Sequence, residues 1–177
     1  MDALARRHSE RAFDTGPLPR QVLSDLLWAA YGINRPSEGG RTAPSALNAQ
    51  DVDLYAVLSD GLYLYDAKAH RLVLVGRTDA RRVTGFQDFV DEAPLDLVYV
   101  ADNAHLSGVA SGERLLFSAM SAGAIAENVY LYCAATGLAT VVRAWFDKKA
   151  LGAALGLSSD EHVLLAQTVG YPAKPSG

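Results

Sequence analysis

One stretch, residues 113–136, constrains the fold more than any other part of the chain. Its sequence, ERLLFSAMSAGAIAENVYLYCAAT, places apolar side chains on more than one face of a helix and is rich in Ala, Ser and Gly. Such a helix is normally buried on several sides, and its small residues allow a second helix to approach closely. We therefore predict a long central helix that ends at Gly137 and favours a subunit interface.

Shorter elements surround this helix. Strand patterns occur at residues 51–75 (three strands), 93–102, 138–145 (a strand or an extended loop) and 161–172. Helical patterns occur at residues 2–8, 19–31, 78–92 and 146–155, and residues 35–50 read as a polar loop with one helical turn after Pro44. The order of these elements predicts a single domain over residues 1–177, of the α+β or mixed α/β class.

The composition narrows the function classes. The chain has 177 residues and a formal net charge of -4, which argues against a general nucleic-acid surface because phosphate binding needs a basic face. The single cysteine, Cys133, excludes an internal disulfide and a cysteine metal cluster, and it is predicted to be a small buried hydrophobe. No apolar run approaches a membrane span and no signal peptide follows Met1, so we expect a soluble, cytoplasmic protein without a bound metal; a leader trimmed from the natural gene product would leave no trace here.

The stretch ARRHSERAF, residues 5–13, gathers cations in an acidic chain. On a helix end, Arg7 and Arg11 would lie one turn apart on the same side, with His8 and Ser9 beside them. Two guanidinium groups and a hydroxyl at that spacing can hold a phosphate through charge-assisted hydrogen bonds. The alternative is a solvated helix face on which Glu10 pairs with a neighbour.

Two later stretches also carry polar or aromatic groups at a chain turn. In APSALNAQ, residues 43–50, Ser45, Asn48 and Gln50 suit recognition of hydroxyls or ring amides, or else serve only as turn and cap residues. In TGLATVVRAWFD, residues 136–147, backbone N–H groups could face a ligand and Trp145 could pack on a flat ring. The alternative for this stretch is a core strand with a buried Trp.

Taken in order, these stretches resemble the FMN-dependent nitroreductase family. That family opens with an Arg-x-Ser-x-Arg/Lys signature, matched here by Arg7, Ser9 and Arg11, and continues with a Pro-Ser-x-x-Asn-x-Gln loop, matched over residues 44–50. An Ala-Pro strand start, a central helix that ends in Gly-Leu, a Phe-Asp turn and a final Val-Gly-Tyr-Pro follow in the family's order over residues 93–172. The resemblance covers nearly the whole chain.

The resemblance implies a fold, an assembly and a cofactor. The expected fold is α+β, with a mixed, mainly antiparallel sheet flanked by helices, in an obligate homodimer that has the long helix in its interface. FMN is expected between the subunits. The residues implied in binding it are Arg7, His8, Ser9, Arg11, Pro44, Ser45, Ala46, Asn48, Gln50, Gln87, Val142, Arg143, Ala144, Trp145 and Lys174.

Each group of these residues has an implied role. Residues 7–11 would hold the phosphate and ribityl chain, with Lys174 adding to the phosphate site, and residues 44–46 would reach the flavin of the partner subunit. Asn48 and Gln50 would support that loop or the cofactor, and Gln87 would meet the pyrimidine edge. Residues 142–145 would lie along the isoalloxazine, with a backbone N–H of Ala144 or Trp145 near flavin N5 and with Arg143 or Arg82 as a candidate cation for reduced flavin.

The implied activity is an FMN-dependent oxidoreductase that passes hydride from NADH or NADPH, via flavin N5, to a small organic acceptor such as a nitroaromatic or a quinone. GLYLYD at residues 61–66 and the compact length further suggest the SagB-like branch, the azoline oxidases of peptide maturation. A non-catalytic FMN-binding module is the alternative from another class. The chain departs from the family at Asp51, where Pro is frequent, and at Ala144 and Trp145, where smaller residues are frequent.

Overall fold

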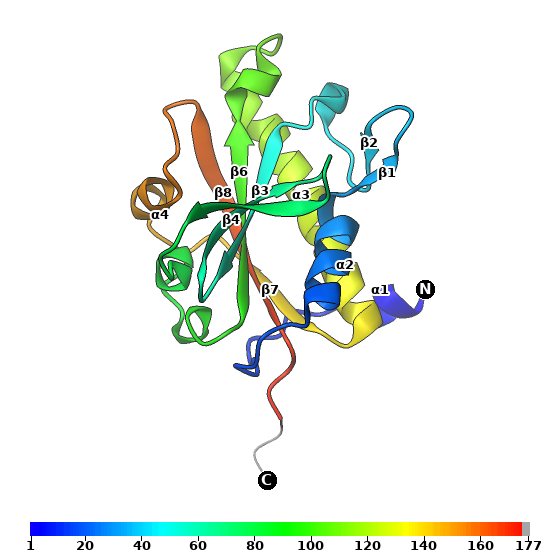
Figure 1. Cartoon of the computed structure of the whole chain (residues 1–177). Helices are drawn as coiled ribbons and strands as arrows, with labels where there is room; N and C mark the ends of the chain where they lie inside the picture. Colours follow the sequence, from blue (N-terminus) through cyan, green and yellow to red (C-terminus); the bar gives the residue numbers. More distant parts are fainter. Residues whose placement is uncertain (175–177) are drawn as a thin grey trace.

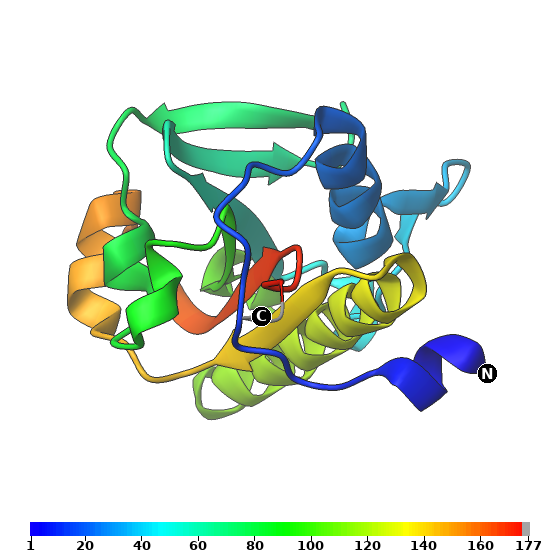
Figure 2. The ribbon, with the colours of Figure 1, turned by 90° about the horizontal axis from the view of Figure 1, so that it is seen from below.

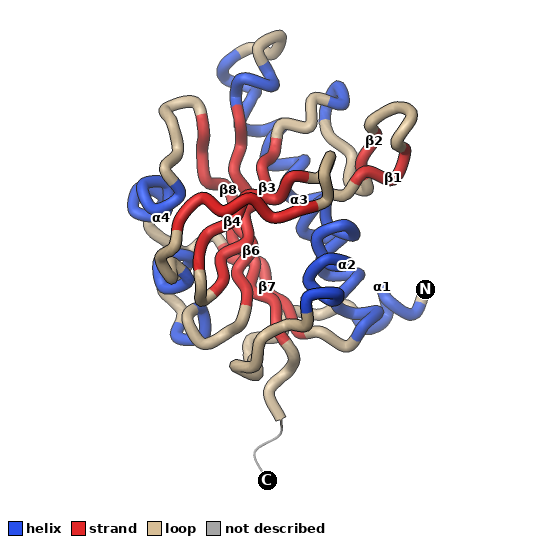
Figure 3. The backbone as a smooth tube through the Cα atoms, in the orientation of Figure 1, coloured by secondary structure: helices blue, strands red, loops and turns tan. Residues whose placement is uncertain are grey.

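The centre of the molecule is an antiparallel sheet with the strand order β5-β4-β3-β6-β8-β7 (Figure 1, Figure 3). The structure, a computed structural model, describes residues 1–174. The strands of this sheet are β3 (Val52–Leu58), β4 (Gly61–Asp66), β5 (Arg71–Gly76), β6 (Leu95–Asp102), β7 (Ala139–Arg143) and β8 (Glu161–Gly170). All the pairings within this sheet are antiparallel. A separate hairpin consists of β1 (Ile33–Arg35) and β2 (Gly40–Arg41).

Helices cover both faces of the sheet. The α-helices are α1 (Asp2–Arg6), α2 (Arg20–Tyr31), α3 (Ser111–Thr136) and α4 (Lys148–Leu155). Short 3-10 turns join other elements: η1 (Ala46–Asn48), η2 (Arg81–Thr84), η3 (Asp88–Val90) and η4 (Asn103–Leu106). No helix within residues 1–174 combines the length and apolar content needed to cross a bilayer.

The alternation of side chains along each strand explains why both faces need cover. On β6, Leu95, Leu97 and Tyr99 belong to the core that α2 and α3 close, and all three are fully buried. Val98 and Val100, which point to the other face, belong to the core that α4 closes. Because β6 is buried on both faces, its sequence is almost continuously apolar.

The two edges of the sheet differ. The N-terminal segment crosses beside edge strand β7, where the Glu10 N–H donates to the Thr140 carbonyl oxygen at 3.0 Å (Figure 2). Farther along, Phe13 forms an isolated bridge with Pro172. The other edge strand, β5, keeps Val73, Leu74 and Val75 partly exposed. The covered edge carries the RRHSERAF stretch and residues 142–145, whereas the predicted residues 44–50 lie elsewhere.

The expected fold class is confirmed, as are most of its elements. The three strands predicted within residues 51–75 are β3, β4 and β5, and the long helix is α3. Gly137 ends α3 in the left-handed conformation (φ 79°), as a helix-terminating glycine should. Asp147 caps α4 by accepting hydrogen bonds from the N–H groups of Lys149 and Ala150. Cys133 is buried as predicted, and burial raises the pKa of its thiol to about 12.

Three local predictions differ from the structure in extent or type. The helix predicted for residues 2–8 ends at Arg6, because the following segment pairs with β7 instead. Residues 78–92 are not a helix: extended Gly85 separates η2 from η3, and the Arg143 guanidinium occupies the space where a Gly85 side chain would lie. The predicted loop at residues 35–50 contains β2 and the last residue of β1, which together form a hairpin, as well as the expected turn after Pro44.

Candidate functional site

Tyr130, on the buried side of α3, joins two of the predicted stretches. Its hydroxyl lies 2.8 Å from Ser9 Oγ and accepts a hydrogen bond from the Val142 N–H at 2.9 Å. The Arg7 guanidinium carbon lies 5.1 Å from the centroid of the Tyr130 ring, within cation–π range. One side chain therefore holds the RRHSERAF stretch against β7.

The cations of this stretch do not lie on a helix, which corrects the one-turn spacing expected for Arg7 and Arg11. The backbone leaves the helix at Arg7 (φ −59°, ψ 120°), and Arg7 and Ser9 still reach the same side chain, Tyr130. Lys174 is brought near the same segment, because the N–H of the preceding Ala173 donates to the Ala12 carbonyl oxygen at 2.9 Å. Within residues 1–174, Arg7, Arg11 and Lys174 form no ion pair.

The acidic residue of this stretch does not neutralise the arginines. Glu10 Oε1 accepts hydrogen bonds from the N–H groups of Ala12 (2.9 Å) and Arg11 (2.7 Å), and these bonds lower the pKa of the carboxyl. Its other oxygen lies 3.9 Å from His8 Nε2, so the expected pairing of Glu10 with a neighbour is with His8. The guanidinium groups of Arg7 and Arg11 remain available for an anion.

The end of β7 is fixed by a buried ion pair. Arg143 is only 6% exposed, and its Nη2 donates to Asp96 Oδ1 on β6 and to Thr168 Oγ1 on β8 (2.8 Å). Its Nη1 donates to the Thr84 carbonyl oxygen at 2.6 Å. Burial raises the pKa of Asp96 to about 6, although Arg143 and two threonine hydroxyls oppose the shift. The charge of Arg143 is thus neutralised by Asp96 inside the protein. The prediction that Arg143 is a cation for reduced flavin is therefore wrong.

The residues after Arg143 turn outward. Trp145 is 66% exposed, which overturns the alternative of a buried core Trp, and its ring stacks edge-on against Phe86 with 5.5 Å between the centroids. The Trp145 carbonyl oxygen accepts a hydrogen bond from the Phe86 N–H at 3.2 Å. Within the described residues, the N–H groups of Ala144 and Trp145 donate to no backbone carbonyl outside helices and strands. Two backbone donors therefore remain unused at the end of β7.

Gln87 lies close to this turn. Gly85 sits between them, since a side chain there would meet both the Arg143 guanidinium and Gln87 Oε1. Gln87 Oε1 is buried and has no hydrogen-bond partner within residues 1–174. A buried acceptor without a partner is costly, so a donor from a bound molecule would stabilise it. Arg82, the other candidate cation, donates instead to the Gln87 carbonyl oxygen (2.9 Å) and lies 3.5 Å from the Asp91 carboxylate.

The Pro44–Gln50 loop has a different character. Leu47, Asn48 and Gln50 all have positive φ (56°, 53° and 51°), which is uncommon outside glycine. Ser45 Oγ accepts the Gln50 N–H at 2.9 Å, and the Gln50 amide bonds to Arg41 and to the Gly39 carbonyl oxygen. The Ser45 and Gln50 side chains thus shape the loop, while Leu47 at its tip is 81% exposed.

The loop and the RRHSERAF stretch lie at opposite ends of α3 (Figure 1). Directly after the loop, Asp51 accepts a hydrogen bond from Ser121 Oγ at 3.0 Å, whereas Ser9 contacts Tyr130. Nine residues of helix separate these two anchor points, which corresponds to about 14 Å. Within one chain, the predicted residues therefore form two groups rather than one site.

Comparison with known proteins identifies the family. The model of the nitroreductase family matches residues 4–171. The chain belongs to the nitroreductase family. A protein of Methanocaldococcus jannaschii named as a nitroreductase is 30% identical over 159 residues, which cover 84% of this chain and 80% of that protein.

Solved structures agree with this assignment to the nitroreductase family. A crystal structure named as a nitroreductase of Ralstonia eutropha is 48% identical, with a TM-score of 0.94, and the match covers 98% of this chain and 83% of that one. A chain of the microcin synthetase complex of E. coli shares the fold at 17% identity, with a TM-score of 0.85 over 96% of this chain and 70% of that one.

Two residues that hold this site together, Tyr130 and Asp96, were not predicted from the sequence motifs. Tyr130 carries a recognisable signal, because it lies on the apolar face of α3 and a buried tyrosine hydroxyl needs a partner. Asp96 carries a similar one, as a charged residue within an apolar strand. Neither signal predicts which residue is the hydrogen-bond partner, because that residue lies in a distant segment in both cases.

Proposed function

We propose that this member of the nitroreductase family is an FMN-dependent oxidoreductase that uses NADH or NADPH and reduces a small organic acceptor. The observation that carries the proposal is the row of unused polar groups along β7. Arg7, Arg11 and Lys174 have no ion pair within residues 1–174 at one end, and the N–H groups of Ala144 and Trp145 lie at the other. Cations suit a phosphate, and backbone donors suit the acceptor edge of a flavin ring.

The residues present fit FMN. Arg7, Ser9, Arg11 and Lys174, with His8 beside them, would hold the phosphate and ribityl chain. Val142 to Trp145 would lie along the ring, and the unpartnered Gln87 Oε1 would accept a hydrogen bond from its pyrimidine edge. When bound, FMN supplies the hydride chemistry between nicotinamide and acceptor.

The role of the protein itself would be to position the cofactor and the incoming molecule. The buried Arg143–Asp96 pair holds the end of β7, so that the N–H groups after it keep a fixed direction. The exposed Trp145 and Phe86 rings would flank an incoming flat molecule and restrict its approach. No side chain at this turn need act as a general acid.

The complete site would need two copies of the chain. Because the Pro44–Gln50 loop and Arg7 lie toward opposite ends of α3 within one chain, we infer that the loop would contribute Pro44, Ser45, Ala46 and Asn48 to the partner's cofactor. Leu116, Met120 and Gly123 lie on one exposed face of α3, and Leu47 is exposed beside that helix. Exposed apolar faces of this kind are typical of a subunit interface. We infer a homodimer with α3 in its interface.

The first test is the visible absorption spectrum of the purified protein, repeated after anaerobic addition of NADPH or NADH. A flavin band that bleaches supports the oxidoreductase, and a band that persists supports the non-catalytic module. A colourless protein that refuses added FMN contradicts both.

Binding of FMN can be tested residue by residue. Arg7→Ala and Arg11→Ala should each weaken FMN binding by about tenfold or more, because each removes a charged hydrogen bond to the phosphate. Arg35→Ala is the matched control, since Arg35 is exposed and lies 3.8 Å from Glu38. Unchanged FMN affinity in both test variants would exclude the phosphate assignment.

The SagB-like azoline oxidase is the second candidate. GLYLYD, the stretch that suggests this candidate, forms β4 in a three-strand arm, β3–β4–β5. A flavin that resists nicotinamides but is reduced by an azoline-containing peptide would distinguish this candidate from a nitroreductase.

A further inference from the structure

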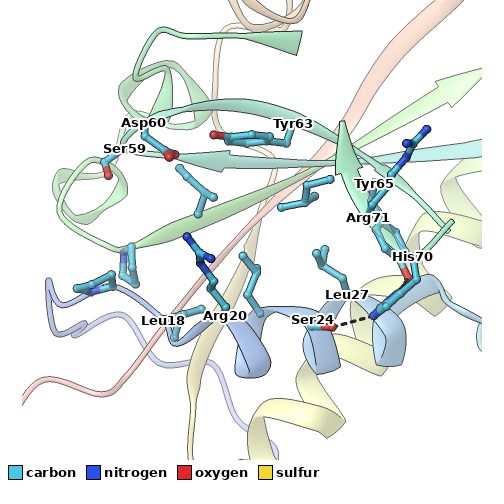
Figure 4. Close-up of a pocket in the computed structure, with 15 residues that line it drawn as sticks. Leu18, Arg20, Ser24, Leu27, Ser59, Asp60, Tyr63, Tyr65, His70 and Arg71 are labelled. Carbon is cyan, nitrogen blue, oxygen red and sulfur yellow. Dashed lines mark hydrogen bonds between the residues drawn. The ribbon is translucent and has the colours of Figure 1, made fainter. Parts of the chain in front are cut away.

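A cavity of about 570 Å³ lies between α2 and the β3–β4–β5 arm (Figure 4). It is at the β5 edge of the sheet, whereas the proposed cofactor residues lie at the β7 edge and beyond the far end of α3. None of the proposed cofactor residues lines it. Its volume is within the range usual for small-molecule sites.

Apolar side chains form most of the cavity wall. They come from the segment before α2, from α2 itself, from the arm and from the residue before β6: Pro17, Leu18, Leu23, Leu27, Leu58, Leu72 and Pro94. Leu27 is buried, and Leu23 and Leu72 are partly buried against the main core. The cavity therefore offers an apolar compartment to a hydrocarbon group.

Two opposite charges face this compartment from different elements. Arg20, the first residue of α2, extends toward the wall that carries Asp60 and Tyr63 (Figure 4). Neither Arg20 nor Asp60 forms an ion pair within residues 1–174. Burial raises the pKa of Tyr63, and the nearby Asp60 carboxylate adds to the shift. Arg71, also at the cavity, already pairs with Asp66 at 3.3 Å.

The other end of the cavity is closed by a hydrogen-bonded chain. Ser24 Oγ lies 2.8 Å from His70 Nε2, and the Tyr65 hydroxyl lies 2.9 Å from His70 Nδ1. His70 is held at a φ of 47°, an uncommon value for a histidine, at the turn between β4 and β5. Because this chain joins α2 to the arm, it fixes the width of the cavity, and its polar atoms are already partnered.

We propose that this cavity binds an apolar α-amino acid. Its carboxylate would meet Arg20, its ammonium group would meet Asp60, and its side chain would enter the leucine-lined compartment. A cation and an anion that face one apolar compartment from two walls match a zwitterion with a hydrocarbon group. The same pair disfavours a dianion, because Asp60 would repel the second negative charge.

Titration calorimetry with L-phenylalanine tests the proposal, together with two analogues that each lack one charge. 3-Phenylpropanoate keeps the carboxylate, and 2-phenylethylamine keeps the ammonium group. Arg20→Gln should weaken binding of L-phenylalanine and 3-phenylpropanoate by about tenfold or more, and should leave 2-phenylethylamine unaffected. Asp60→Asn should show the reverse pattern for the two analogues.

Arg71→Gln is the matched control, since it removes a cation at the same cavity that already has a carboxylate partner. All three side chains are on exposed residues, so the variants should fold normally, and circular dichroism checks this. Failure of L-phenylalanine to bind at millimolar concentration would overturn the proposal. Equal affinity in the wild type, Arg20→Gln and Asp60→Asn would overturn it too. The outcome does not depend on FMN, because the measurement needs no flavin.

Discussion

Polar residues have different roles in two parts of the molecule. One part is the β7 region, which comprises Arg7–Arg11, Tyr130 and Val142–Trp145, and the other is the Pro44–Gln50 loop. In the β7 region a buried network holds the backbone, and Arg7 and Arg11 have no ion pair within the described residues. In the loop, the side chains of Ser45 and Gln50 are used to hold a strained backbone. The exposed group at its tip is a leucine.

This difference indicates what each region can bind: a small molecule in one case and a protein surface in the other. Unused charges and N–H groups can bind a charged small molecule directly through the chain's own polar atoms. A rigid backbone with an apolar tip instead contributes shape, and it suits contact with another protein surface. The two regions are therefore expected to respond to different substitutions, in stability, in cofactor binding or in self-association.

The largest effect is expected from Asp96→Ala. The substitution leaves Arg143 buried without its counter-charge, which should lower the free energy of unfolding by about 3–5 kcal/mol. Urea unfolding followed by circular dichroism measures it. The control is Asp91→Ala, whose exposed pair with Arg82 should be worth less than about 1 kcal/mol. Equal stability of the two variants would show that the buried network does not hold the β7 region.

Gly85→Ala tests the same network by overpacking. The added methyl group would overlap the Arg143 guanidinium and Gln87 Oε1, so the free energy of unfolding should fall by about 1–3 kcal/mol. Gly152→Ala in α4 is the control, since its methyl group has room and the helix should gain up to about 1 kcal/mol. A Gly85→Ala variant as stable as the wild type would mean that Arg143 can move aside.

Leu47→Asp tests the loop. If the exposed leucine is buried in a subunit interface, its loss should weaken self-association by about tenfold or more, because burial of a leucine contributes about 1.5–3 kcal/mol. Sedimentation equilibrium measures the dimer dissociation constant. Leu74→Asp, at an exposed leucine on β5, should leave that constant unchanged. An equal effect of both substitutions would remove the distinction between the loop and any other exposed leucine.

The smallest effect concerns Glu10. Its pKa in the folded protein is below the ordinary value of 4.5, so its stabilisation is complete above that pH and is lost as the pH falls through the lowered value. Amide exchange at Arg11 and Ala12 should accelerate in acid as their carboxylate acceptor is protonated. Glu10→Gln should abolish this pH dependence, apart from the intrinsic exchange rate. An identical profile in the variant would assign the change to another group.

Sequence reasoning found the elements better than their boundaries. The strands at residues 51–75 and the long helix follow from local periodicity, and the structure has both. The segment 78–92 has helix-like composition, yet it is extended at Gly85 because a side chain from β7 occupies the neighbouring space. The identity of that neighbour is not encoded in the local pattern.

The same division holds for the candidate site. The residue types and their order along the chain were sufficient to indicate the nitroreductase family, and the family match agrees. Only the tertiary structure decided that Arg143 is neutralised by Asp96, 47 positions away, and that Ser9 meets Tyr130, 121 positions away. Periodicity reports on neighbours within a helical turn or along one strand, because only those distances are set by the backbone itself. Contacts between distant segments depend on how helices and sheet pack, and packing decides which charges are consumed inside and which remain for a ligand.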